Sequence, residues 1–174
     1  MILRNTTSLE TSGLLALFCR HTSEFDHEGL RVFVRHWRTA PFSGLCYYRE
    51  GRILLNIGRA VVYPYRVTTC IARAESDSRS WWRELYTVDV IDAERLALFV
   101  FLHEFYHWLV FRARRNPRQK ESRCDRFAVR ALVDHYGAAV RDRHGRVVER
   151  DTWDFQDLDG FVWRARRVAR APAG

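Results

Sequence analysis

Residues 96–111 decide the fold. They read Leu96-Ala-Leu-Phe-Val-Phe-Leu-His-Glu-Phe-Tyr-His-Trp-Leu-Val-Phe111, apolar except at His103, Glu104 and His107. On a helix, residues four apart share one face, so both imidazoles of this His-Glu-x-x-His box can reach a single zinc ion. Glu104 is rotated by about 100° from His103, where it can hold a water without binding the metal itself. The stretch therefore predicts a buried helix that carries a metal site and a general base.

Flanking residues set the bounds of two helices. Asp92 is a good N-cap for the helix with the box, which should end near Arg114 because Asn116-Pro117 cannot continue it. A second helix should run from about residue 118 to residue 136, with Gly137 as the residue after its C-cap. The short connection predicts that the two helices pack antiparallel.

The second helix offers the third protein ligand that a catalytic zinc site needs. Glu121-Ser-Arg-Cys-Asp125 places two carboxylates four residues apart on one face. Glu121 would bind the metal, and Asp125 would accept a hydrogen bond from a ligating imidazole and fix its tautomer. His135 competes for the role of third ligand. It lies fourteen residues after Glu121, about 21 Å along a straight helix, so the two cannot serve one ion, and we favour Glu121.

An oxyanion donor is also expected in a site of this kind. Tyr136, His135 and His144 are the candidates, and the sequence does not choose among them.

The two motifs resemble those of known metallopeptidases. Val100-Phe-Leu-His-Glu-Phe-Tyr-His-Trp-Leu109 is similar to the active-site helix of zincins, and Glu121-Ser-Arg-Cys-Asp-Arg-Phe-Ala128 resembles the matching segment of gluzincins of the ImmA/IrrE-like type, which usually have alanine where this chain has Cys124. Residues 44–56 are weakly similar to the sheet of SprT-like proteases. The resemblance implies a zinc metallopeptidase that cleaves peptide bonds, with His103, His107 and Glu121 on the metal and Glu104 as general base.

The expected architecture is α+β: a single zincin-like metallopeptidase domain over residues 1–174, with a short, mostly antiparallel sheet packed on the active-site helix. Residues 30–37, 45–48 and 52–57 alternate or carry strand formers and predict strands. We expect Arg52–Ile57 to be the edge strand along which a substrate peptide lies. Trp81, Trp82 and Trp108 should close the core around the site, and residues 153–170 should form a last amphipathic helix with an Arg-rich face.

Composition bounds the partners. The net charge is +8 and the pI is near 9.8, but Lys120 is the only lysine, so the basic balance is an arginine excess. Nucleic acid or a DNA-bound protein is therefore a conceivable partner beside a peptide substrate. The alternative function is a zincin-fold module that binds zinc and recognises nucleic acid or a protein without catalysis.

The remaining features predict a cytoplasmic protein with no membrane partner. The four cysteines form no CxxC pair, so they indicate buried free thiols. The N-terminus lacks a signal pattern, and no uncharged apolar run is long enough to span a bilayer.

Overall fold

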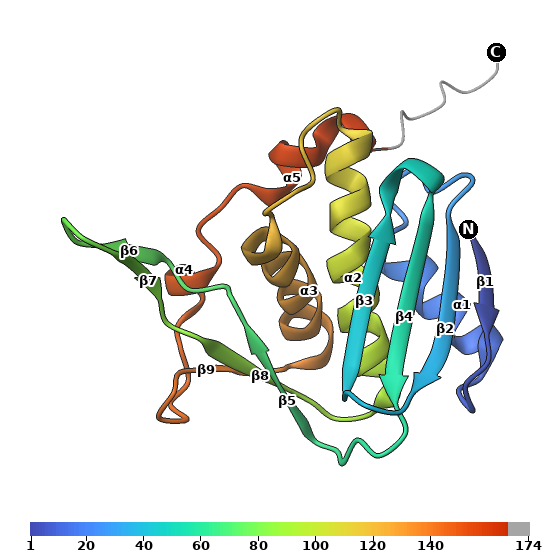
Figure 1. Ribbon diagram of the computed structural model, residues 1–174, viewed down its shortest axis with the longest axis horizontal. Coiled ribbons are helices and arrows are strands. Elements are labelled where there is room, and N and C mark those ends of the chain that lie inside the picture. The colour runs from blue at the N-terminus through green and yellow to red at the C-terminus, as the bar shows by residue number, and fades with distance from the viewer. Residues whose placement is uncertain (167–174) are drawn as a thin grey trace.

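The first third of the chain builds a four-stranded sheet. In the computed structural model, which describes residues 1–166, β1 (Ile2–Asn5), β2 (Arg31–Trp37), β3 (Phe42–Tyr47) and β4 (Arg52–Gly58) lie in the order β1-β2-β4-β3 (Figure 1). β1 and β2 run parallel, as do β2 and β4, and only β3 and β4 are antiparallel.

The expectation of a mostly antiparallel sheet is therefore wrong for the sheet that packs on the central helix. After β2, residues 38–41 lead the chain to β3, which is not the neighbour of β2 in the sheet. The β3–β4 hairpin then places β4 between β2 and β3. That path makes β4 parallel to β2. β3 and β4 are joined by a tight hairpin: a 3-10 turn, η1 (Tyr48–Glu50), leads to Gly51, whose φ of 59° suits glycine.

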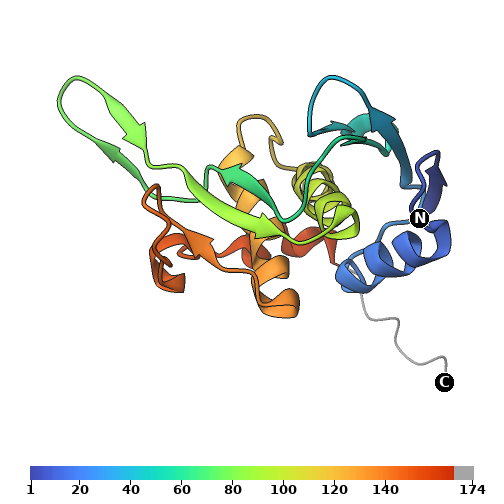
Figure 2. The same ribbon diagram turned by 90° about the horizontal axis from the view of Figure 1, so that it is seen from below.

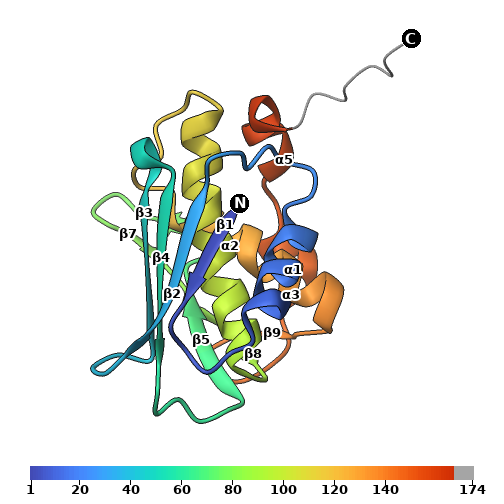
Figure 3. The ribbon, with the colours of Figure 1, turned by 90° about the vertical axis from the view of Figure 1, so that its right-hand side faces the viewer.

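Helices cover one face of this sheet. α1 (Thr11–His21) and α2 (Ala93–Arg112) lie against it, and α3 (Glu121–Tyr136) packs on the far side of α2 (Figure 3). Both predicted caps are present: the Asp92 carboxylate accepts a hydrogen bond from the Arg95 N–H, and Gly137 ends α3 with a φ of 66°. α2 is apolar around most of its circumference because it is enclosed by the sheet, α1 and α3. Among the described residues, no helix has the length and apolar character needed to cross a bilayer.

A second region extends away from this core. β5 (Tyr65–Thr69), β8 (Tyr86–Val90) and β9 (Val140–Arg141) form a small antiparallel sheet, and between β5 and β8 the chain runs out into a hairpin of β6 (Ala74–Ser76) and β7 (Trp81–Arg83) (Figure 2).

The hairpin corrects the expectation for the tryptophans. Trp108 is buried in the core, but Trp81 and Trp82 are 72% and 46% exposed. They cannot close the core because they lie on the projecting hairpin, which pairs only with itself within the described chain.

The C-terminal part forms short elements in place of the single helix expected over residues 153–170. α4 (Arg150–Trp153), α5 (Leu158–Val162) and the 3-10 turn η2 (Trp163–Ala165) follow one another. Asp157 starts α5 by accepting a hydrogen bond from the Gly160 N–H, so the chain begins a new helix there. Arg167 and Arg170 of the predicted Arg-rich face lie outside the described residues.

Candidate metal centre

α2 and α3 bring the predicted ligands together. The His103 and His107 rings lie 5.2 Å apart on one face of α2, and the Glu121 carboxylate from the first turn of α3 sits in front of both. Glu121 Oε2 is 3.1 Å from His103 Nε2, and Glu121 Oε1 is 3.4 Å from His107 Nε2. One carboxylate and two ring nitrogens therefore converge on one point, as expected from the sequence.

Each ring is held from behind through its other nitrogen. Nδ1 of His103 donates to Asp125 Oδ1 at 2.8 Å, and Nδ1 of His107 donates to the Pro117 carbonyl at 2.9 Å. The Cys70 N–H donates to the second Asp125 oxygen at 2.7 Å and so fixes that carboxylate as well. With each Nδ1 used as a donor, the Nε2 lone pairs are left for a cation, which is the arrangement that metal-binding histidines need.

The charges of the centre favour a bound cation. Burial by itself would lower the pKa of His103, but the hydrogen bonds with Asp125 and Glu121 outweigh it and raise the pKa to about 10. The hydrogen bonds from His103 and His107 hold the pKa of Glu121 well below its ordinary value. In the absence of a metal, a proton is thus held between the histidines and Glu121. A divalent cation would take the place of this proton.

Glu104 packs against the sheet, with His103 and His107 close to its carboxylate. Its side chain is buried against Gly44 of β3, where an added Cβ would lie 2.6 Å from Glu104 Cγ, so only glycine fits. The Cys46 N–H donates a hydrogen bond to its carboxylate. Burial raises the pKa of Glu104, although His103 and His107 act in the opposite direction. A carboxylate whose pKa is shifted upward is a stronger base than an exposed glutamate.

A cysteine lies beside the histidines as well. Cys124 Sγ and one ring nitrogen from each of His103 and His107 lie within 4.8 Å of one another, and this group could also hold a metal ion. The thiol is fully buried, and burial raises its pKa well above the ordinary value. Two donors therefore adjoin the histidines: the Glu121 carboxylate, which faces both Nε2 atoms, and the Cys124 thiol.

The edge strand beside the centre is β3, which corrects the choice of Arg52–Ile57. β4 holds those residues in the interior of the sheet, hydrogen-bonded to β2 on one side and β3 on the other. The N–H of Cys46 points off the β3 edge toward Glu104, and the backbone groups of Gly44 point the same way because alternate residues of a strand share a side. The free edge of β3 therefore adjoins the Glu104 carboxylate.

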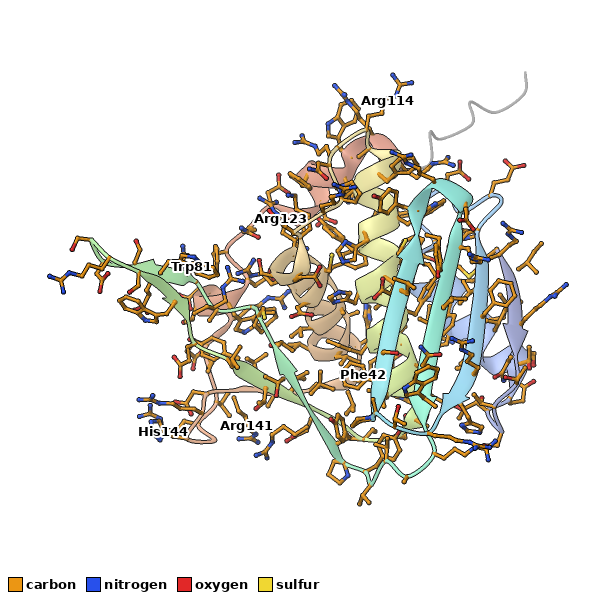
Figure 4. All side chains as sticks on the ribbon, viewed as in Figure 1. Phe42, Trp81, Arg114, Arg123, Arg141 and His144 are labelled. Atoms are coloured by element: carbon orange, nitrogen blue, oxygen red, sulfur yellow. The ribbon has the colours of Figure 1, made fainter. Side chains whose placement is uncertain are left out.

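The proposed oxyanion donors are wrong. Tyr136 and His135 lie at the other end of α3, about 22 Å from Glu121 by helix geometry. The Tyr136 hydroxyl is hydrogen-bonded to His21 Nε2 at 2.8 Å, and the His135 ring packs on His21. His144 lies in the turn after β9, which Figure 4 shows far from the start of α3 at Arg123.

Four supporting contacts were not predicted from the sequence. The Pro117 carbonyl, the Cys70 N–H and the Cys46 N–H act through the backbone, which leaves no residue-type signal. The fourth is Arg126, which is fully buried and donates to the carbonyls of Ile71 and Trp153. Arg126 ties α3 to Ile71, next to Cys70, whose N–H binds the Asp125 carboxylate. The only signal of this role in the sequence was its position directly after Asp125.

No family model, curated protein or solved structure matches this chain.

Proposed function

We propose that the chain is a zinc-dependent metallopeptidase of the zincin type. The observation that supports it most strongly is the convergence of His103 Nε2, His107 Nε2 and the Glu121 carboxylate on one point, with both Nδ1 atoms already engaged. His103, His107 and Glu121 would hold the ion, and an open fourth position would remain on the exposed side, where the Glu121 side chain is 61% exposed. Bound zinc supplies Lewis acidity, which makes water acidic enough to deprotonate near neutral pH and polarises a carbonyl.

The residues of this chain then perform the proton transfers. Glu104 accepts a proton from the attacking water and delivers it to the nitrogen of the leaving amine. Its contacts with Gly44 and the Cys46 N–H fix the carboxylate at the edge of β3. A substrate peptide that pairs with this edge as an added strand would present its scissile carbonyl beside Glu104.

The test compares metal content and hydrolysis in the same preparations. Glu104→Gln should retain one zinc per chain, as measured by elemental mass spectrometry. Its rate of peptide hydrolysis should fall about 10³-fold, because the general base is removed while the ligands remain. Full hydrolytic activity in zinc-loaded Glu104→Gln would remove Glu104 from the mechanism. Loss of zinc in that variant would instead make it a ligand.

Cys124 favours a second candidate, a zinc-binding module without catalysis. If the thiolate joined His103, His107 and Glu121, four protein ligands would close the site, as in structural zinc centres. Cobalt substitution separates the two: an intense thiolate-to-cobalt absorption near the ultraviolet, lost in Cys124→Ala, would support the closed site. Full retention of metal and hydrolysis in Cys124→Ala would support the open one.

A further inference from the structure

The connection between α2 and α3 concentrates positive charge beside the metal centre. Residues 113–123 hold five cationic side chains and a single carboxylate, Glu121, which is engaged with the histidines. The five cations are Arg114, Arg115, Arg118, Lys120 and Arg123. None of them forms an ion pair with a carboxylate of residues 1–166, whereas arginines elsewhere do, for example Arg130 and Arg150, which both contact Asp154.

Three of these cations line one hollow. The hollow has a volume of about 500 Å³ and is bounded by Arg115, Lys120 and Arg123 with the polar side chains Asn116, Gln119 and Ser122, above the ring of Phe161. No carboxylate is among its lining residues. We call this feature the basic hollow. Figure 4 shows Arg123 at the start of α3 and Arg114 beyond the end of α2, both in the upper half of the view.

The cations of the basic hollow are held in place without being neutralised. The guanidinium carbons of Arg115 and Arg123 lie 4.3 and 4.1 Å from the Phe161 ring centroid. A cation–π contact orients a guanidinium but does not cancel its charge, so its N–H groups can still bind an anion. α3 also begins here without a side-chain cap at Lys120, so the positive end of its dipole adds to the potential.

We propose that the basic hollow binds acidic side chains of the peptide that is cleaved at the metal centre. Lys120 and Ser122 flank the ligand Glu121 in the chain, and Pro117 of the same connection holds His107. An extended peptide advances by roughly 3.3 Å per residue, so Asp or Glu residues a few positions from the scissile bond can reach the hollow. The assignment to a cleaved peptide rests on the proposed function, but the anion site itself does not.

A local acidic ligand fits better than a nucleic-acid track. Binding along a phosphate backbone needs cations spread over a continuous surface. Much of the remaining arginine charge is paired in the structure: Arg66 with Asp89, Arg112 with Asp26 and Arg146 with Asp142. Other arginines that form no ion pair within residues 1–166, such as Arg4 of β1 and Arg79 of the β6–β7 hairpin, belong to separate elements. The basic hollow gathers three cations with no carboxylate among its lining residues, and it has room for one or two carboxylates of a ligand.

The experiment measures binding with the zinc-loaded full-length Glu104→Gln protein, so that no probe is consumed. Fluorescein-labelled ten-residue peptides are made as matched pairs that differ only in two adjacent residues, Glu-Glu against Gln-Gln, and the dissociation constant is read by anisotropy. We expect the acidic peptide to bind about tenfold more tightly in low salt. The preference should fall to about twofold with Lys120→Gln/Arg123→Gln added. It should persist with Arg79→Gln/Arg143→Gln, an equal loss of two charges at exposed turns that do not line the hollow.

Three results would overturn the proposal. Equal affinities for the paired peptides, or an equal loss of preference in Arg79→Gln/Arg143→Gln, would mean that the hollow does not select carboxylates. Displacement of the acidic peptide by a single-stranded oligonucleotide at lower concentration than by the unlabelled peptide would assign the hollow to nucleic acid. Circular dichroism of each variant checks the fold. If the charge preference is found but the wild type hydrolyses none of the peptides, the proposed peptidase function fails while the acidic-peptide site stands.

Discussion

A pair of neighbouring histidines lies beside each end of α3, and only one pair has the contacts that a metal site needs. At the N-terminal end, the His103 and His107 rings are 5.2 Å apart; at the C-terminal end, the His21 and His135 rings are 4.8 Å apart. The first pair has acceptors behind both rings and Glu121 in front. In the second pair, His21 Nε2 is used by the Tyr136 hydroxyl. Proximity of two imidazoles is therefore not enough to make a metal site. The groups that hydrogen-bond to the rings from behind and face them in front make the difference.

The electrostatics of the two pairs are opposite. Burial, with smaller contributions from His135 and Arg20, lowers the pKa of His21 to about 4, so that ring stays neutral. The pKa of His103 is raised to about 10 because its hydrogen-bonded carboxylates outweigh burial. The surroundings thus disfavour a charged ring at one end of α3 and favour a charged ring at the other.

The largest expected effect breaks the comparison directly. His103→Ala should reduce bound zinc from one per chain to almost none, because two ligands do not make a stable site. His21→Ala should leave the zinc content unchanged. Metal analysis after gel filtration in a weak chelator measures both, and equal zinc loss in the two variants would contradict the assignment of the site to the N-terminal end of α3.

The next effect tests what holds the metal-binding end rigid. Arg126→Met removes hydrogen bonds to buried carbonyls of Ile71 and Trp153, and each acceptor left without a donor costs about 1–3 kcal/mol. We expect the free energy of unfolding in urea to fall by about 3 kcal/mol. Arg66→Met, which breaks an exposed pair with Asp89, should cost less than about 1 kcal/mol. Similar losses in the two variants would show that Arg126 is not a central tie.

A smaller effect is expected from the carboxylate behind His103. Asp125→Asn keeps the shape but weakens the acceptor for Nδ1–H, and we expect zinc affinity to fall about 10- to 100-fold. Competition with a chromophoric chelator measures it. Asp134→Asn, at the other end of α3, is the control and should change zinc affinity by less than about twofold. Unchanged affinity in Asp125→Asn would mean that this hydrogen bond does not orient the ligand.

The smallest effects concern pH, and the two pairs should give opposite signs in the metal-free protein. His21 has a lowered pKa, so its contribution to stability is present above about pH 6.5 and lost as pH falls toward about 4. His103 has a raised pKa, so its contribution is full below about pH 6.5 and lost as pH rises toward about 10. Urea midpoints across this range measure both limbs.

Two variants assign those limbs. His21→Gln should flatten the acid limb in part, since Glu121, with its lowered pKa, also loses its contribution as pH falls. His103→Gln should flatten the alkaline limb. An alkaline limb that is unchanged in His103→Gln would show that the raised pKa is not the source of this dependence.

The sequence by itself determined the two central helices and the residues that face each other across them. The His103/Glu104/His107 spacing, the Glu121/Asp125 spacing, Asp92 and Gly137 are local signals, because a helix fixes the relative positions of residues a few apart. The contact between residues of α3 and α2 was also foreseeable, because helices joined by a short connection pack antiparallel.

Only the tertiary structure decided the rest. β3 is the edge strand because of the path through residues 38–41, the hairpin exposes Trp81 and Trp82, and Tyr136 turns toward His21. The groups that fix the site from behind, Pro117 O, Cys70 N–H and Cys46 N–H, belong to the backbone. Backbone groups of this kind recur along the whole chain. Which of them contacts a given side chain depends on how distant segments pack, and the order of residues in a single sequence does not indicate this.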